Sequence, residues 1–332
     1  MANNRFNPTK FIKLALFFLG VLLLFFLVRR VGFREIIEII SQTRLNFIIY
    51  GFLIYLLLIL ARALKWFLLI KAGGSEIKYK EFLPFYFVNS LISNISPLKS
   101  GEAATPFILK KYLKIPVGQG FSVVILDRFF ELIIFTLIFA SAIIYIIKSV
   151  VVGGLVLSIF KWALAGFVLL IFLLITVIVS QKYTFKILAL LNRFEKYSLI
   201  KRILEFIKKE LLIFYESLLL YKNKSVIKFM IPLTLIGWLF EFLSFYLIFI
   251  SVMPAPFLHI ASAQILAIAA TLVTFIPGGM GVGELGTVYI LNLYNYPAIL
   301  STAGALLARL ILTGTLLILG ISGTFFIKEK VD

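Results

Sequence analysis

The chain has 332 residues, of which 62% are hydrophobic and 14% are charged, and its net charge is +18. A soluble domain carries about 25% charged residues, so this composition excludes an ordinary soluble protein and indicates the membrane class. The sequence has no cysteine, which excludes disulfides, and its single histidine argues against a histidine-based metal centre. We therefore expect neither a metal nor another cofactor.

Six apolar segments are long enough to cross a bilayer as helices, because a crossing needs roughly 20 residues. They cover residues 11–28, 46–70, 117–147, 155–180, 227–252 and 298–327. The first segment alone could serve as a signal peptide, but Arg29 and Arg30 follow it where a small-residue cleavage site would stand. We interpret it as a retained transmembrane helix.

Two further apolar segments, 82–113 and 260–296, are interrupted at residues 96–101 and 277–283. Proline removes a backbone donor and glycine disfavours helix, so neither segment forms one continuous helix. Each half is too short to span a bilayer, which favours two re-entrant hairpins whose non-helical backbone is buried or lines a cavity. We expect the second, glycine-rich break to be the more mobile. The residues expected to form the breaks are Pro97, Gly101, Pro277, Gly278, Gly279, Gly281 and Gly283.

The segment 181–226 differs from the spans because it is rich in lysine and arginine and has apolar residues at helical spacing. This pattern predicts basic amphipathic helices that lie on the cytoplasmic face of the membrane, although an ordinary solvated linker would have a similar composition. With the N-terminus inside and each hairpin returning to its own side, 22 basic residues lie on the cytoplasmic face and 6 on the outer face. This asymmetry predicts a multi-pass plasma-membrane protein with both termini in the cytoplasm.

The basic residues between 29 and 44 are an exception to this asymmetry, and we expect an interfacial helix there. Most of the other basic residues lie beside apolar spans, where they meet anionic lipid headgroups. We therefore expect membrane lipids, and not nucleic acid, as partners.

The two broken segments resemble each other residue by residue. Each break is followed by a glutamate, and by an arginine in the next span that comes 26 residues later in the first copy and 25 in the second. With the orientation above, the copies run in opposite directions, as in transporters built from inverted repeats. We thus expect an all-α polytopic fold, a single membrane domain over 1–332, with about six full transmembrane helices and two broken hairpins. The repeats would cover 46–147 and 227–327. The matching residues are Glu102, Thr105, Ile108, Leu109, Tyr112 and Arg128 in the first copy, and Glu284, Thr287, Ile290, Leu291, Tyr294 and Arg309 in the second.

Many ionisable residues lie within the apolar segments, where each costs a few kcal/mol to insert. They could pair with one another to lock the helix bundle, or they could surround a polar cavity. The breaks favour the cavity, because the N-terminus of a half-helix binds anions and nearby basic residues would complete a site for a phosphate headgroup. Glu102 and Glu284 could also simply cap their own half-helices. The candidate binding residues are Arg62, Lys65, Lys99, Glu102, Asp127, Arg128, Glu131, Glu241, Glu284 and Arg309.

Several short motifs resemble those of the flippase-like membrane family that includes the transmembrane region of lysylphosphatidylglycerol synthase. The resemblance covers residues 8–328 and implies a domain that translocates lipid. In the full synthase a separate soluble domain makes the aminoacylated lipid; the sequence to Asp332 contains none, so we do not expect synthase activity. The motifs are Arg62-x-x-Lys65-Trp66, Asn89 with Pro97-x-x-x-Gly101-Glu102, Asp127-Arg128-x-x-Glu131, Ala308-Arg309 and the string from Pro277 to Glu284.

The leading hypothesis is a flippase or translocator for an anionic phospholipid or a polyprenyl-linked glycan, whose headgroup binds between the two breaks. A second hypothesis is a membrane-embedded enzyme that modifies a lipid, with Glu102, Asp127 or Glu284 as its base. A third is a membrane partner of a separate aminoacyl-lipid or glycan synthetase. The sequence is compatible with a homo-oligomer, and we assign no catalytic residue to it.

Overall fold

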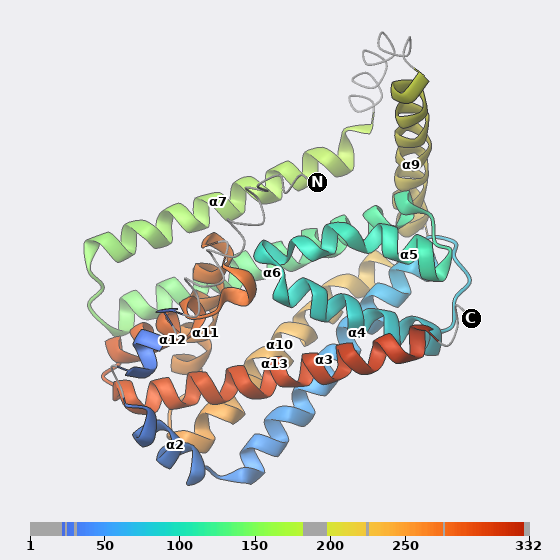
Figure 1. Ribbon diagram of the computed structural model, residues 1–332. Helices are drawn as coiled ribbons and strands as arrows, with labels where there is room; N and C mark the ends of the chain where they lie inside the picture. Colours follow the sequence, from blue (N-terminus) through green and yellow to red (C-terminus); the bar gives the residue numbers. More distant parts are fainter. Residues whose placement is uncertain are drawn as a thin grey trace, which may run out of the picture.

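The computed structural model describes residues 22–23, 25–29, 32–181, 198–223, 226–274 and 276–328. Regular structure in these ranges is helical throughout, as the predicted all-α class requires (Figure 1). The helices are α2 (Phe33–Ser41), α3 (Leu45–Ala72), α4 (Tyr79–Ile95), η1 (Pro97–Ala104), α5 (Thr105–Leu113), α6 (Val117–Ser149), α7 (Gly154–Val179), α9 (Ser198–Asn223), α10 (Ile227–Val252), α11 (Phe257–Val273), η3 (Pro277–Gly279), α12 (Val282–Leu293) and α13 (Ala298–Lys328).

Five of the described helices, α3, α6, α7, α10 and α13, are long and apolar enough to cross a membrane. They match five of the six predicted spans, so the chain is a polytopic membrane protein. The sixth predicted span, 11–28, lies mostly outside the described residues. Helix α7 packs mainly on α6, and Phe167 is its one fully buried residue, which suits a helix that meets lipid on most of its surface.

The ends of the long helices define two faces of the molecule, which we call the α9 face and the α2 face after the short or amphipathic helix that lies at each. At the α9 face, Gln119 Nε2 donates to the carbonyl oxygen of Ile70 at 2.7 Å and so joins the start of α6 to the end of α3. At the α2 face, the amide of Arg44 donates to the carbonyl oxygen of Ser251 at 3.3 Å and joins the start of α3 to the end of α10. Helix α2 occupies the segment where an interfacial helix is expected.

The two broken segments form hairpins that enter from opposite faces. The first consists of α4, η1 and α5; it starts and ends at the α9 face, where Lys110 lies 3.5 Å from Glu210 of α9. The second consists of α11, η3 and α12; it starts and ends at the α2 face, where the rings of His259 and Tyr294 stack 4.1 Å apart. The breaks η1 and η3 contact each other between the faces. This arrangement confirms the predicted pair of opposed hairpins.

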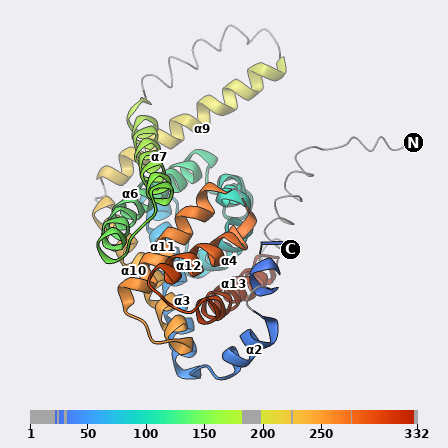
Figure 2. The ribbon, with the colours of Figure 1, turned by 90° about the vertical axis from the view of Figure 1, so that its left-hand side faces the viewer.

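The packing of the helices is pairwise, as two inverted copies require. Helices α3 and α10 run side by side in Figure 1 and are neighbours in the view of Figure 2, α4 packs on α13, and α11 packs on α6. Within each copy the returning half-helix packs on the span that follows it, α5 on α6 and α12 on α13. The exact limits of the repeats, 46–147 and 227–327, stay predictions.

The two breaks use glycine for different reasons. Gly278 and Gly279 have φ values of 62° and 61°, in the left-handed region that strains any residue with a side chain. Gly101 is needed for a close approach, because a Cβ atom there would lie 2.8 Å from the carbonyl oxygen of Ile92. In the first break a 3₁₀ helix of 8 residues takes the place of an open loop.

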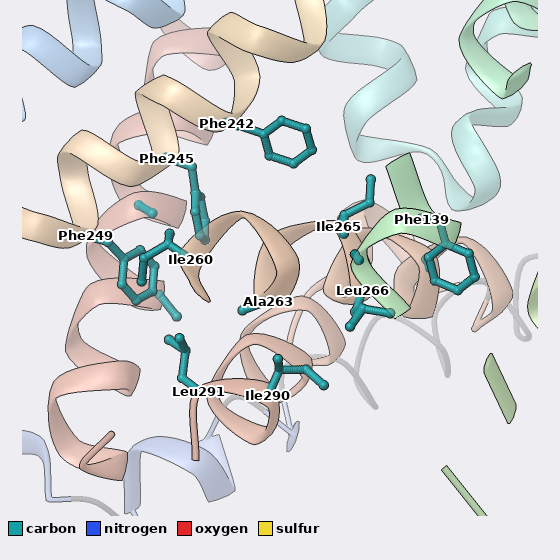
Figure 3. Close-up of a cluster of buried hydrophobic side chains, with 14 of the residues drawn as sticks. Phe139, Phe242, Phe245, Phe249, Ile260, Ala263, Ile265, Leu266, Ile290 and Leu291 are labelled. Carbon is teal, nitrogen blue, oxygen red and sulfur yellow. The ribbon is translucent and has the colours of Figure 1, made fainter. Parts of the chain in front are cut away.

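The second hairpin is held in place by an apolar core. Figure 3 shows Ile260, Ala263 and Leu266 of α11 among phenylalanine side chains from neighbouring helices and Ile290 of α12. Small residues bring the two half-helices together: a Cβ atom at Gly286 would lie 3.2 Å from the Cα atom of Ala267. Lipid tails are as apolar as these side chains, so close packing, and not exclusion of water, stabilises such a contact.

Helix α9 confirms that the basic linker contains a helix, although residues 182–197 and 224–225 of the predicted linker lie outside the described residues. In Figure 1 it runs across the ends of the long helices. Glu210 Oε2 accepts a hydrogen bond of 2.7 Å from the amide of Gly118, one of the amides at the start of α6 that have no partner within the helix. The hydroxyls of Tyr221 and Ser122 form a hydrogen bond of 2.8 Å. These contacts attach the linker to the first repeat.

Candidate functional site

Charged side chains from both repeats gather near the middle of the long helices. They come from α3, α6, α10 and α13, together with the segments that follow the two breaks. The helices that carry them are otherwise apolar, so each charge needs a partner or water to offset its loss of hydration. The structure provides a partner for every predicted site residue whose side chain it describes.

Lys65 of α3 lies at the centre of the first group and is almost completely buried. Its ammonium is 2.8 Å from Asp127 and 2.5 Å from Glu131, and it also donates to the Thr234 hydroxyl at 3.3 Å. Asp127 and Glu131 are four residues apart on α6, so they share one face of that helix and reach the same cation. The ion pairs of this group join the first and last helices of the first repeat, and the hydrogen bond to Thr234 reaches α10 of the second repeat.

Arg128 extends this group to the first break. Its guanidinium lies 3.0 Å from Asp127 and 2.9 Å from Glu102 of η1. Glu102 lies in the 3₁₀ helix that precedes α5, so it does not cap this half-helix directly. Pro97 begins η1, but its side chain and that of Lys99 lie outside the described side chains.

Arg309 and Glu284 form the matching pair in the second repeat. The Arg309 Nε–H donates to Glu284, while Nη1 donates to the carbonyl oxygen of Gly278 at 2.6 Å and Nη2 to that of Gly279 at 3.2 Å. Glu284 lies in the first turn of α12 and accepts a hydrogen bond of 2.9 Å from the amide of Gly281, so it both caps its helix and pairs with the arginine. These four hydrogen bonds join the second break to α12 and α13. The glycines of this break therefore adopt left-handed turns that hydrogen bonds hold in place. Greater mobility at this break stays a prediction.

One ion pair joins the two repeats directly. Arg62 Nη1 of α3 lies 3.0 Å from Glu241 Oε2 of α10, and their side chains are 27% and 17% exposed. The pairs of Lys65, Arg128 and Arg309 each stay within one repeat. Among the ion pairs between described residues of the two repeats, Arg62–Glu241 is thus the single link.

A cavity of about 200 Å³ lies beside this link. The second break bounds it through Gly278 and Gly283, and Glu241, Glu284 and Arg309 supply its charged groups. The remaining polar lining includes Tyr55, Asn94, Gln264, Thr271, Thr287 and Thr313, from five helices of both repeats.

The structure brings the predicted residues together but divides them between two places. Glu241, Glu284 and Arg309 line the cavity, whereas Lys65, Asp127, Glu131, Arg128 and Glu102 form the paired group nearer the α9 face. The described side chains do not form a chamber of free basic groups, because each arginine and lysine of the set has a carboxylate partner. The locking of the bundle by mutual pairing, which the sequence left open, is present; binding of a lipid by these residues stays a prediction.

Sequence reasoning missed the uncharged polar side chains that line the cavity, including the amides of Asn94 and Gln264. Gln264 is the one amide side chain of the largely apolar α11, and this was the signal that could have identified it. It is 4% exposed, its Nε2 donates to the carbonyl oxygen of Glu241 at 3.5 Å, and its Oε1 has no hydrogen-bond partner in the described part of the chain.

Comparison with known proteins extends this description. The sequence matches the family model described as lysylphosphatidylglycerol synthase TM region over residues 10–320. A UPF0104 membrane protein of Methanocaldococcus jannaschii is 25% identical over 315 residues, 91% of each chain. A second such protein of the same organism is 30% identical over 255 residues, 74% of this chain and 95% of the relative. The chain belongs to the family of the lysylphosphatidylglycerol synthase transmembrane region.

Proposed function

We propose that this protein translocates a lipid across the bilayer, moving the headgroup along the contact between the two repeats while the acyl chains stay in the membrane. The observation that carries the proposal is the position of the cavity. It lies where two hairpins from opposite faces meet, and it is bounded by the second break. Substrate sites of transporters with inverted repeats lie at such a position.

The charged residues support this function because a headgroup crossing the hydrocarbon must exchange its water for other polar partners. A column of polar groups runs from the first group around Lys65, past Arg62 and Glu241, to the cavity. An anionic phospholipid or a lipid-linked glycan could exchange contacts along it. The resemblance of the family to a lipid translocating domain points the same way.

The Arg62–Glu241 pair suggests how access alternates. The pairs of Lys65, Arg128 and Arg309 make each repeat rigid, and the Arg62–Glu241 pair is the charged link that must rearrange when one repeat moves against the other. A headgroup that binds beside Glu241 would weaken this link and favour the movement. Rigid-body movement of one repeat about the other is the usual route in such folds.

An enzyme that uses a carboxylate as base is less well supported. Glu102, Asp127 and Glu284 are each held in an ion pair with a neighbouring cation, so none of them is left free to face a substrate. A role as a membrane partner of a separate synthetase makes no use of the cavity.

The test is translocation of fluorescent lipids in proteoliposomes, with dithionite quenching to report the outer leaflet and mass spectrometry to report covalent change. We expect wild-type protein to move lipid without altering it, and the Arg62→Met/Glu241→Gln variant to lose most of this activity. The matched control is Lys110→Met, which removes another ion pair but one that is half exposed and lies at the α9 face. A chemically altered lipid would support an enzyme, and unchanged transport in the double variant would refute the proposed link.

The orientation belongs to the same proposal: the α9 face and both termini are cytoplasmic, in the plasma membrane. Because the chain has no cysteine, single-cysteine variants can be labelled without changing the background. Val151→Cys, at a position 95% exposed between α6 and α7, should react with an impermeant maleimide in intact cells. Lys209→Cys, on α9, should react only after the cells are permeabilised. The reverse pattern would invert the topology.

A further inference from the structure

The cavity beside Glu241 is electrically balanced. Its two carboxylates, Glu241 and Glu284, are paired with Arg62 and Arg309. A further charge placed in the cavity would either break one of these pairs or stay without a counter-ion, and both outcomes are costly in a site of low dielectric constant. The charge balance therefore favours a neutral group as the occupant.

The lining contains a buried acceptor without a partner. Gln264 is 4% exposed, and its Oε1 is unpartnered in the described part of the chain. A buried polar atom without a partner is unfavourable, so a bound group that donates a hydrogen bond would relieve this oxygen.

The lining also offers donors to the same occupant. A guanidinium has five N–H groups, and Arg309 uses three of them, for Glu284, Gly278 and Gly279. The side-chain amide of Asn94 lines the same cavity and can donate as well as accept. A group that both donates and accepts at several positions fits this mixture, and a hydroxyl does both.

The volume limits the size of this group. A water molecule takes about 30 Å³ in the liquid, so the cavity of about 200 Å³ has room for a glycerol unit or one sugar ring. Pockets for larger ligands start at roughly 300 Å³.

From these observations we infer that the cavity binds the uncharged, hydroxyl-bearing end of a lipid headgroup, a glycerol or a single sugar, and that Gln264 selects for its hydroxyls. This inference rests on the proposed function and adds the class of headgroup to it. The ion pairs around the cavity exclude a headgroup that ends in a charge.

The experiment compares three fluorescent lipids with the same acyl chains in the proteoliposome assay. Phosphatidylglycerol carries two hydroxyls, phosphatidylmethanol has the same charge but no hydroxyl, and phosphatidylethanolamine ends in an ammonium. We expect wild-type protein to move phosphatidylglycerol at least about tenfold faster than phosphatidylmethanol, since each hydrogen bond contributes about fivefold to tenfold. Faster movement of phosphatidylethanolamine, or no preference between the two anionic lipids, would overturn the inference.

Gln264→Met tests the residue itself, because methionine keeps the length of the side chain without its amide. We expect this variant to reduce the preference for phosphatidylglycerol about fivefold to tenfold. The control is Thr302→Val, which changes another buried polar side chain that also has no partner in the described residues and does not line the cavity. A preference that persists in Gln264→Met removes Gln264 from the site.

A binding measurement separates failure of the inference from failure of the proposed function. Short-chain phosphatidylglycerol should raise the thermal unfolding midpoint of wild-type protein in detergent more than short-chain phosphatidylmethanol does, and Gln264→Met should abolish the difference. If neither lipid moves but this difference remains, the translocation proposal fails and the binding site stands. If the midpoints of wild-type protein do not differ between the two lipids, the binding site fails, whatever the transport assay shows.

Discussion

Replacing Lys65 by methionine removes the ammonium that lies 2.8 Å from Asp127 and 2.5 Å from Glu131, in a site where the lysine is 1% exposed. Asp127 keeps Arg128 at 3.0 Å, but Glu131 loses its closest partner. Removing one member of a buried ion pair costs about 3–5 kcal/mol, because the other charge stays buried without compensation. In a chain of this size about 2 °C of unfolding midpoint corresponds to 1 kcal/mol, so we expect a loss of roughly 6–10 °C.

The assay is thermal unfolding of purified protein in detergent, followed by a fluorescence readout. Lys65→Met/Glu131→Gln should recover a large part of the loss, because the second change removes the charge that the first leaves unpaired. Lys110→Met is the control: its side chain is 52% exposed and 3.5 Å from Glu210, so its pair contributes about 0–1 kcal/mol. A midpoint for Lys65→Met within about 2 °C of wild type, or no rescue by Glu131→Gln, would refute a stabilising role for this group.

Three other changes have defined outcomes. Gly118→Ala should loosen α9, since its Cβ would lie 2.0 Å from the carbonyl oxygen of Glu210, and limited proteolysis should then cut α9 faster. Gly278→Ala should lower the unfolding midpoint, because alanine at a φ of 62° costs about 1–2 kcal/mol; an unchanged midpoint would contradict the strain. Burial lowers the pKa of His259, at the α2 face, from its usual value of about 6.5. The unfolded state therefore takes up this proton first, so stability should fall as the pH drops from about 6.5 through the folded-state pKa, and His259→Phe should remove that component.

Local patterns were sufficient to predict much of this architecture. The long apolar runs predicted the spans, because a helix in lipid must satisfy its own backbone. Pro97 and Pro277 predicted where two helices stop. The glutamate after each break and the arginine in the next span were recognised as matching positions of the repeat. In the structure they form an ion pair in each copy, Glu102–Arg128 and Glu284–Arg309.

The contacts between distant segments could not be predicted in this way. Arg62 and Glu241 are 179 residues apart, and their pairing depends on α3 and α10 lying side by side. Gln264 lines the cavity, and one amide side chain in a largely apolar helix does not reveal that cavity. The 3₁₀ helix in the first break also escapes sequence reasoning, because its proline and glycine are equally compatible with an open loop.

The distribution of the ion pairs shows how the same charges can stabilise the protein and still permit movement. Lys65 with Asp127 and Glu131, and Arg309 with Glu284, hold helices of one repeat together and need not change when the repeats move. Arg62–Glu241 crosses between repeats, and it borders the cavity. Replacing it by an uncharged pair should leave the thermal midpoint nearly unchanged while it alters transport, because removing both charges together leaves neither of them buried without a partner. A large loss of stability in Arg62→Met/Glu241→Gln with transport intact would mean that this pair, too, serves only to lock the bundle.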